Sequence, residues 1–128
     1  MNFNLLRVFF FIYIVPFVSS CSDYQKLLNG DDTSEKYKEA EVYYNNGEYS
    51  KANRLFEQII PKYRGKPQAQ RIIFFFADSY FQIKSYYLAA YQYENFIKSY
   101  PKSQRIQEAT FKAAVSYYFL SPKFSLDQ

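Results

Sequence analysis

A period of 37 residues runs through residues 33–128 and constrains the fold more than any other feature of the chain. Shifting the sequence by this period places aromatic residues on aromatic residues and alanine on alanine. The aligned sets are Tyr37, Phe74 and Phe111; Ala40, Ala77 and Ala114; Tyr43, Tyr80 and Tyr117; Tyr44, Phe81 and Tyr118; and, recurring once, Ala52 with Ala89 and Phe56 with Tyr93. Such self-similarity predicts stacked structural units, because a single unit cannot bury its apolar face alone.

The spacing inside one unit predicts a helical hairpin. Ala40 and Tyr43 precede a turn at Gly47, and Ala52 and Phe56 follow it. Small residues let two antiparallel helices approach, and the rings fill the space beside them. This pattern resembles the tetratricopeptide repeat, which is normally about 34 residues long. The second unit departs from it at Lys84, which stands where the first unit has the turn glycine.

The predicted fold class is therefore all-α, a tetratricopeptide-like helical-hairpin solenoid of about two and a half repeats over residues 33–128. The expected helices cover residues 33–46, 49–63, 67–83, 86–99 and 103–120. The third unit stops after one helix, so we expect a truncated product, a fragment or a chain that a partner completes, because terminal repeats need a polar outer face.

Residues 1–20 predict a signal peptide. Arg7 precedes an apolar run over residues 8–18, and the small residues Ser19 and Ser20 follow. The run is shorter than the roughly 20 residues that a transmembrane helix needs. The order of charged, apolar and small segments is typical of a secretory signal, and the alternative is a buried core segment.

Cys21 is the only cysteine, and it follows this signal directly. The sequence Val18-Ser19-Ser20-Cys21 resembles a bacterial lipobox. The resemblance implies cleavage before Cys21, lipidation of its thiol and acylation of its new amine; the alternative is a free thiol. Several acyl chains anchor a protein stably, at about 0.8 kcal/mol per buried CH₂. Residues 21–32 would then be a lipidated tether. The resemblance also implies the outer membrane, because Ser22 stands where some bacterial lipoproteins have the Asp linked to inner-membrane retention.

Composition excludes several classes of site. The chain has no His and one Cys, so it lacks the residues for a Ser-His-Asp or Cys-His centre, a His/Cys zinc site or an internal disulfide. The net charge of +4 is spread along the chain. We therefore expect no enzyme activity, no metal, no cofactor, no nucleic acid and no small-molecule substrate.

A lipobox followed closely by these repeats resembles the BamD family of outer-membrane protein assembly lipoproteins. The motifs that carry the resemblance are CSDYQKLL from Cys21, YSKANRLFEQIIPKYR from Tyr49, FIKSYP from Phe96, and Ser121-Pro122 with SLDQ from Ser125. It implies a lipid-anchored scaffold of the β-barrel assembly machinery at the outer membrane, facing the periplasm. The implied partners are a BamA-type insertase and unfolded outer-membrane proteins. The alternatives are another periplasmic repeat adaptor and a nutrient-binding outer-membrane lipoprotein.

The first helix of each tetratricopeptide hairpin lines the concave face of the array, and this register predicts a peptide-binding surface. The expected residues are Tyr37, Glu41, Tyr44, Phe74, Asp78, Phe81, Phe111, Val115 and Tyr118. Barrel segments end in aromatic-rich strands, so an aromatic groove would suit them. The alternative is that these rings pack the array itself, because aromatic stripes at helical spacing are usually core.

Overall fold

The structure is a computed structural model, and it describes residues 19–121. The chain divides into two compact parts, residues 1–32 and residues 33–128. In the first part, helix α2 covers Ser19–Asn29, so Cys21 lies in a helical turn and the predicted tether is largely helical. Residues 1–18 of the predicted signal peptide (residues 1–20) and the SLDQ motif from Ser125 lie outside the described residues.

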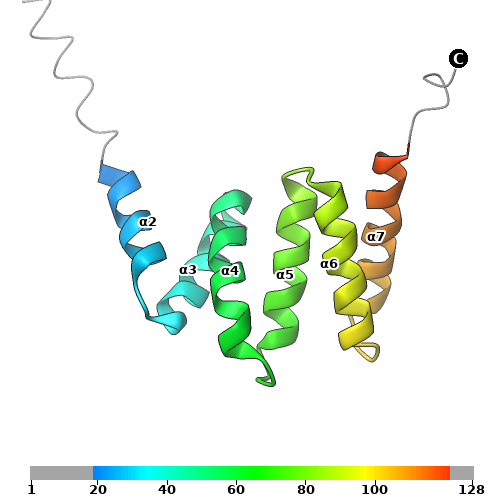
Figure 1. Cartoon of the computed structure of the whole chain (residues 1–128), viewed down its shortest axis with the longest axis horizontal. Helices are drawn as coiled ribbons and strands as arrows, with labels where there is room; N and C mark the ends of the chain where they lie inside the picture. Colours follow the sequence, from blue (N-terminus) through cyan, green and yellow to red (C-terminus); the bar gives the residue numbers. More distant parts are fainter. Residues whose placement is uncertain (1–18, 122–128) are drawn as a thin grey trace, which may run out of the picture. The chain divides into compact units, whose positions relative to one another are not determined.

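Five helices form the second part, and each packs against the next (Figure 1). They are α3 (Thr33–Asn45), α4 (Tyr49–Tyr63), α5 (Ala69–Gln82), α6 (Tyr86–Ser99) and α7 (Ile106–Leu120). Short turns make neighbouring helices antiparallel, and residues 19–121 contain no strand. The predicted all-α, tetratricopeptide-like repeat fold is confirmed.

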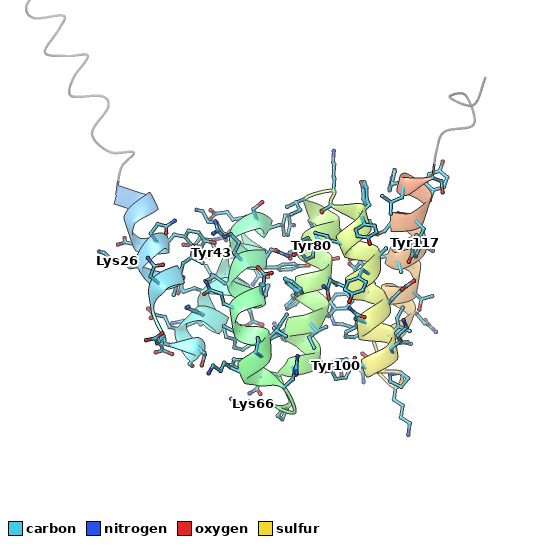
Figure 2. The ribbon with its side chains drawn as sticks, in the orientation of Figure 1. Lys26, Tyr43, Lys66, Tyr80, Tyr100 and Tyr117 are labelled. Carbon is cyan, nitrogen blue, oxygen red and sulfur yellow. The ribbon has the colours of Figure 1, made fainter. Side chains whose placement is uncertain are left out.

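The predicted small residues let the helices approach. Ala40, Ala52, Ala77 and Ala89 are fully buried, and side chains fill the spaces between neighbouring helices (Figure 2). Small side chains at a helix contact bring the two axes closer and leave room for large rings on either side. Tyr43 and Tyr80, two of the rings expected to fill the space beside these alanines, are only half-buried.

Helix α5 packs with two different faces. On one face, Asn53 of α4 donates a hydrogen bond of 2.8 Å to the hydroxyl of Ser79. On the other face, Phe74 and Phe81 contact α6, with ring centroids 6.0 and 6.4 Å from that of Tyr93. A helix in the middle of a stack must be apolar on both sides, which explains the unbroken apolar run of α5 over residues 72–77.

Helix α7 packs with one face only. Ala109, Ala113 and Ser116 are buried, and the two alanines join the cluster that holds Tyr93 and Phe96 of α6. Ala114 aligns with the buried Ala77 in the repeat, but it is exposed. The second face of α7 therefore lies open in the described part of the repeat unit.

The turns after α3 and α5 share one backbone conformation although their residues differ. Gly47 has a φ of 80° and Lys84 a φ of 63°. The amides of Gly47 and Lys84 donate to the carbonyls of Tyr44 and Phe81, at 3.1 and 3.0 Å. These are the hydrogen bonds of a left-handed helix cap, a conformation that glycine adopts without strain and other residues adopt at a cost.

Replacing Lys84 by glycine is therefore expected to stabilise the protein by about 1 kcal/mol. The matched change, Gly47→Ala, is expected to destabilise it by a similar amount. A Cβ atom at Gly47 would meet nothing closer than 4.0 Å, so its cost is conformational rather than steric. Urea unfolding midpoints of both variants test this. Equal midpoints for Lys84→Gly and the parent would show that Lys84 carries no strain.

Candidate interaction surface

A buried carboxylate, Asp78 on α5, joins four helices. Its side chain is 1% exposed. Tyr93 of α6 donates a hydrogen bond of 2.6 Å to it, and Tyr44 of α3 and Lys112 of α7 also donate to it. Gln82, one turn further along α5, donates at 3.2 Å. A buried charge persists only when it is paired and hydrogen-bonded, and Asp78 meets both conditions.

These contacts decide the charge states of the cluster. Burial alone would raise the pKa of Asp78, but the hydrogen bonds from Lys112, Tyr44 and Tyr93 outweigh it, and the pKa is lowered. Burial alone would lower the pKa of Lys112, but Asp78 and then Glu108 raise it. Burial and the neighbouring Asp78 both raise the pKa of Tyr44 and of Tyr93. The cluster thus holds an ion pair between two neutral phenols, which suits a structural role rather than proton transfer.

Helices α3 and α5 and the N-terminal end of α7 present one surface, which we name the α3–α5–α7 face. It consists of Glu41 on α3, Arg71 and Phe75 on α5, the N-cap residue Arg105 of α7, and Glu108 on α7. Arg71, 58% exposed, pairs with Glu41 at 2.6 Å. The ring centroid of Phe75 lies 5.1 Å from the guanidinium carbon of Arg71 and 5.4 Å from that of Arg105. Two cations therefore flank one half-buried ring, an arrangement stabilised by cation–π attraction.

The predicted peptide-binding residues fall into three groups. Phe74 and Asp78 are buried, so they are not on an open surface of this chain, contrary to their expected placement. Phe111 and Tyr118 are exposed. The half-buried group consists of Tyr37, Glu41, Tyr44, Phe81 and Val115.

Contacts within the chain explain the half-buried group. The ring of Tyr37 packs 5.5 Å from that of Tyr63 on α4, and its hydroxyl donates to Glu41 at 3.0 Å. The carboxylate of Glu41 also forms an ion pair with the exposed Arg71. The ring of Tyr44 lies 4.5 Å from that of Phe75. Most of the expected aromatic rows therefore pack against a neighbouring helix.

The sequence analysis assigned none of the following residues of the cluster and the α3–α5–α7 face to a site: Arg71, Phe75, Arg105, Glu108 and Lys112. The repeat pattern does not point to these residues, because the residues at equivalent positions differ in charge and polarity. Phe75 aligns with Lys38 and Lys112, and Arg71 aligns with Ser34 and Glu108. The available signal was the spacing of Arg71 and Phe75, which puts them on one face of a helix.

The described residues contain neither a cluster of metal ligands nor a helix that could span a membrane. Within residues 19–121, no three His, Cys, Asp or Glu side chains gather in a way that would hold a metal ion. None of the helices in this same region combines the length and apolar character that a membrane span requires.

The family model of YfiO, described as an outer membrane lipoprotein, matches residues 29–127. This span contains the whole repeat from α3 to α7, including the Asp78 cluster and the α3–α5–α7 face. The chain belongs to the YfiO family. No curated protein matches the chain. Membership of this family of outer membrane lipoproteins supports an association of the chain with the outer membrane.

Proposed function

We propose that the chain is a lipid-anchored scaffold of the outer-membrane β-barrel assembly machinery. In this role it holds a BamA-type insertase and receives unfolded outer-membrane proteins at the periplasmic side of the membrane. The observation that carries the proposal is the YfiO family match across the whole helical repeat. The proposal gives the chain no catalytic step and no cofactor.

The proposed anchor is a lipid on Cys21. Cys21 precedes the repeat by about a dozen residues, so a lipid there would hold the first hairpin near the membrane surface. The intact mass of the membrane-extracted protein tests this step, with Cys21→Ala as the control. A product that lacks residues 1–20 and carries acyl chains supports the anchor. An unprocessed product without acyl chains contradicts it.

The proposed surface for unfolded substrates is the α3–α5–α7 face. Phe75 offers an apolar ring there, and Arg71 and Arg105 offer guanidinium donors to peptide carbonyls. Barrel strands alternate apolar and polar residues, carry aromatic residues at the edges of the apolar band, and have backbone hydrogen bonds that are unmade before assembly. A surface with an aromatic ring and hydrogen-bond donors fits both properties.

Arg71→Ala is expected to weaken binding of a synthetic aromatic-rich barrel strand about five-fold, which corresponds to the loss of one hydrogen bond worth about 1 kcal/mol. Fluorescence anisotropy measures the affinity, with a scrambled peptide for comparison. Arg54→Ala is the matched control, because Arg54 is exposed on α4 and outside this face. Equal affinities of both variants for the strand would exclude this face.

Co-purification from solubilised membranes tests the scaffold role itself. The full chain is expected to co-purify with a BamA-type insertase. If the insertase binds residues other than Arg71, the Arg71→Ala variant is expected to co-purify with the same amount of it. A preparation that contains no barrel-assembly protein, from membranes where the chain is abundant, would overturn the proposal.

A further inference from the structure

Exposed cations gather at one end of the helical stack. They lie on the last turns of α4 and α6 and in the connections that follow, which Figure 1 shows at the same end. Lys66 is labelled there in Figure 2. The side-chain amide of Gln70, at the start of α5, donates a hydrogen bond of 2.5 Å to the hydroxyl of Ser103 in the other connection. The two connections therefore form one surface, which we name the basic end: Lys62, Arg64, Lys66, Lys98 and Lys102.

No carboxylate balances this charge. Residues 58–77 and 95–107 contain no Asp or Glu. None of the cations of the basic end forms an ion pair within residues 19–121. On the neighbouring helices α3 and α7, Glu41 and Glu108 each pair with other cations. The basic end therefore attracts an anionic partner.

Helix α3 begins at the same end of the stack. The ring of Tyr37, in its second turn, lies 5.5 Å from that of Tyr63, the residue before Arg64. The first turn of α3 contributes Glu35 and Lys36, which leave the net charge of this end unchanged. The tether therefore joins the repeat at its basic end.

The basic end offers charge without an apolar anchor. In the described part of the chain, the exposed large apolar side chains all lie outside residues 61–71 and 98–105. A specific protein interface centres on buried aromatic or aliphatic anchors. Anionic lipid headgroups attract exposed lysine and arginine side chains without such anchors. The basic end therefore fits a diffuse anionic surface better than a folded protein partner.

The family places such a surface beside the chain, because its members are outer membrane lipoproteins. The proposed lipid on Cys21 lies twelve residues before Thr33, where α3 begins. Twelve residues span at most about 40 Å. The membrane surface is thus within reach of the basic end. Only this reach rests on the proposed anchor, whereas the charge of the basic end does not.

We propose that the basic end binds the anionic phospholipid headgroups of the membrane to which the chain is attached. Each lysine or arginine close to an anionic surface strengthens binding about five-fold. The attraction extends over about 10 Å at 0.1 M salt, so the cations need no fixed partner. This contact holds one end of the helical stack at the membrane surface.

Lysine footprinting of the full chain in vesicles tests the contact. The membrane-extracted chain is reconstituted in phosphatidylcholine alone and in phosphatidylcholine mixed with phosphatidylglycerol, and a water-soluble amine reagent is added. Lys66 and Lys102 are expected to react at least several-fold more slowly in the anionic vesicles, as are Lys62 and Lys98. Lys84, in the turn at the other end of α5, is the internal reference and is expected to react equally in both. At 1 M salt, where screening shortens the attraction to about 3 Å, the difference is expected to disappear.

Two arginine variants provide a matched control that leaves every reporting lysine in place. Arg64→Gln is expected to weaken the contact about five-fold, because it removes one cation from the basic end. Arg54→Gln is expected to leave the contact unchanged, because Arg54 is equally exposed but lies on α4 outside the basic end. Circular dichroism checks that both variants are helical.

The outcomes separate the possible partners. Slower reaction in the anionic vesicles, reduced by salt and by Arg64→Gln, supports the membrane surface. Equal reaction in the two kinds of vesicle would overturn the proposal. Protection in native membranes but not in anionic vesicles would also overturn it, and would assign the basic end to an acidic segment of another protein. Since the vesicles contain no other protein, the result is independent of the proposed role in barrel assembly.

Discussion

Asp78→Ala is expected to destabilise the helical stack by about 3 kcal/mol. The change leaves Tyr44, Tyr93 and Lys112 without their shared acceptor. Removing one partner of a buried ion pair typically costs about 3–5 kcal/mol. The lower value applies here, because Lys112 is 20% exposed and also pairs with Glu108 at 3.1 Å.

Glu108→Ala is the matched control, since it removes the other carboxylate that Lys112 contacts. Glu108 is exposed, and exposed ion pairs contribute about 0–1 kcal/mol. Urea unfolding of both variants, followed by circular dichroism, gives the two free energies. Equal losses for Asp78→Ala and Glu108→Ala would show that Asp78 does not hold the stack together.

The pH dependence of stability gives a second readout of the same cluster. The folded-state pKa of Asp78 lies below its ordinary value. Its contribution is therefore present above the unfolded pKa of about 4 and is lost as the pH falls through the folded value. Lys112 acts in the opposite sense, because its raised pKa makes its contribution decline above about pH 10. Asp78→Asn is expected to flatten the acid limb of the profile.

Most of the fold could be predicted from the sequence, because the repeated positions of the alanines, aromatic residues and turn locate the helices and the breaks between them. The expected helix at residues 49–63 matches α4, and the one at 86–99 matches α6. Helices α5 and α7 begin two and three residues later than expected, because residues 66–68 and 101–105 form turns. The equivalence of Lys84 with Gly47 also predicted a turn that composition alone would not, since lysine seldom takes a positive φ.

The sequence did not predict the Asp78 cluster, and the reason is positional. Glu41, Asp78 and Val115 are equivalent in the repeat, so spacing assigns all three the same direction. Asp78 differs because α5 lies between α3 and α7, and both neighbours supply donors to it. Glu41, on the first helix of the stack, pairs with the exposed Arg71 instead. Position in the stack is a tertiary property, and a repeat period does not encode it.

The same dependence on position makes the expected effects of Phe74→Ala and Phe111→Ala very different in size, although the two residues are equivalent in the repeat. Phe74 is 1% exposed, and its ring contacts Phe96 and Tyr93 of α6. Removing a buried phenylalanine side chain costs about 3–5 kcal/mol, which combines lost burial with the cavity left behind. Phe111→Ala is expected to change stability by less than about 0.5 kcal/mol, as at other exposed positions.

Parallel urea unfolding of the two variants, followed by circular dichroism, measures this contrast. A large loss of stability in Phe74→Ala alone would establish that the aromatic rows are core wherever a following helix covers them. A large loss in Phe111→Ala as well would contradict the exposed position of Phe111. The contrast between one residue and its equivalent thus separates the packing that the stacked helices require from the chemistry that the repeat merely shares.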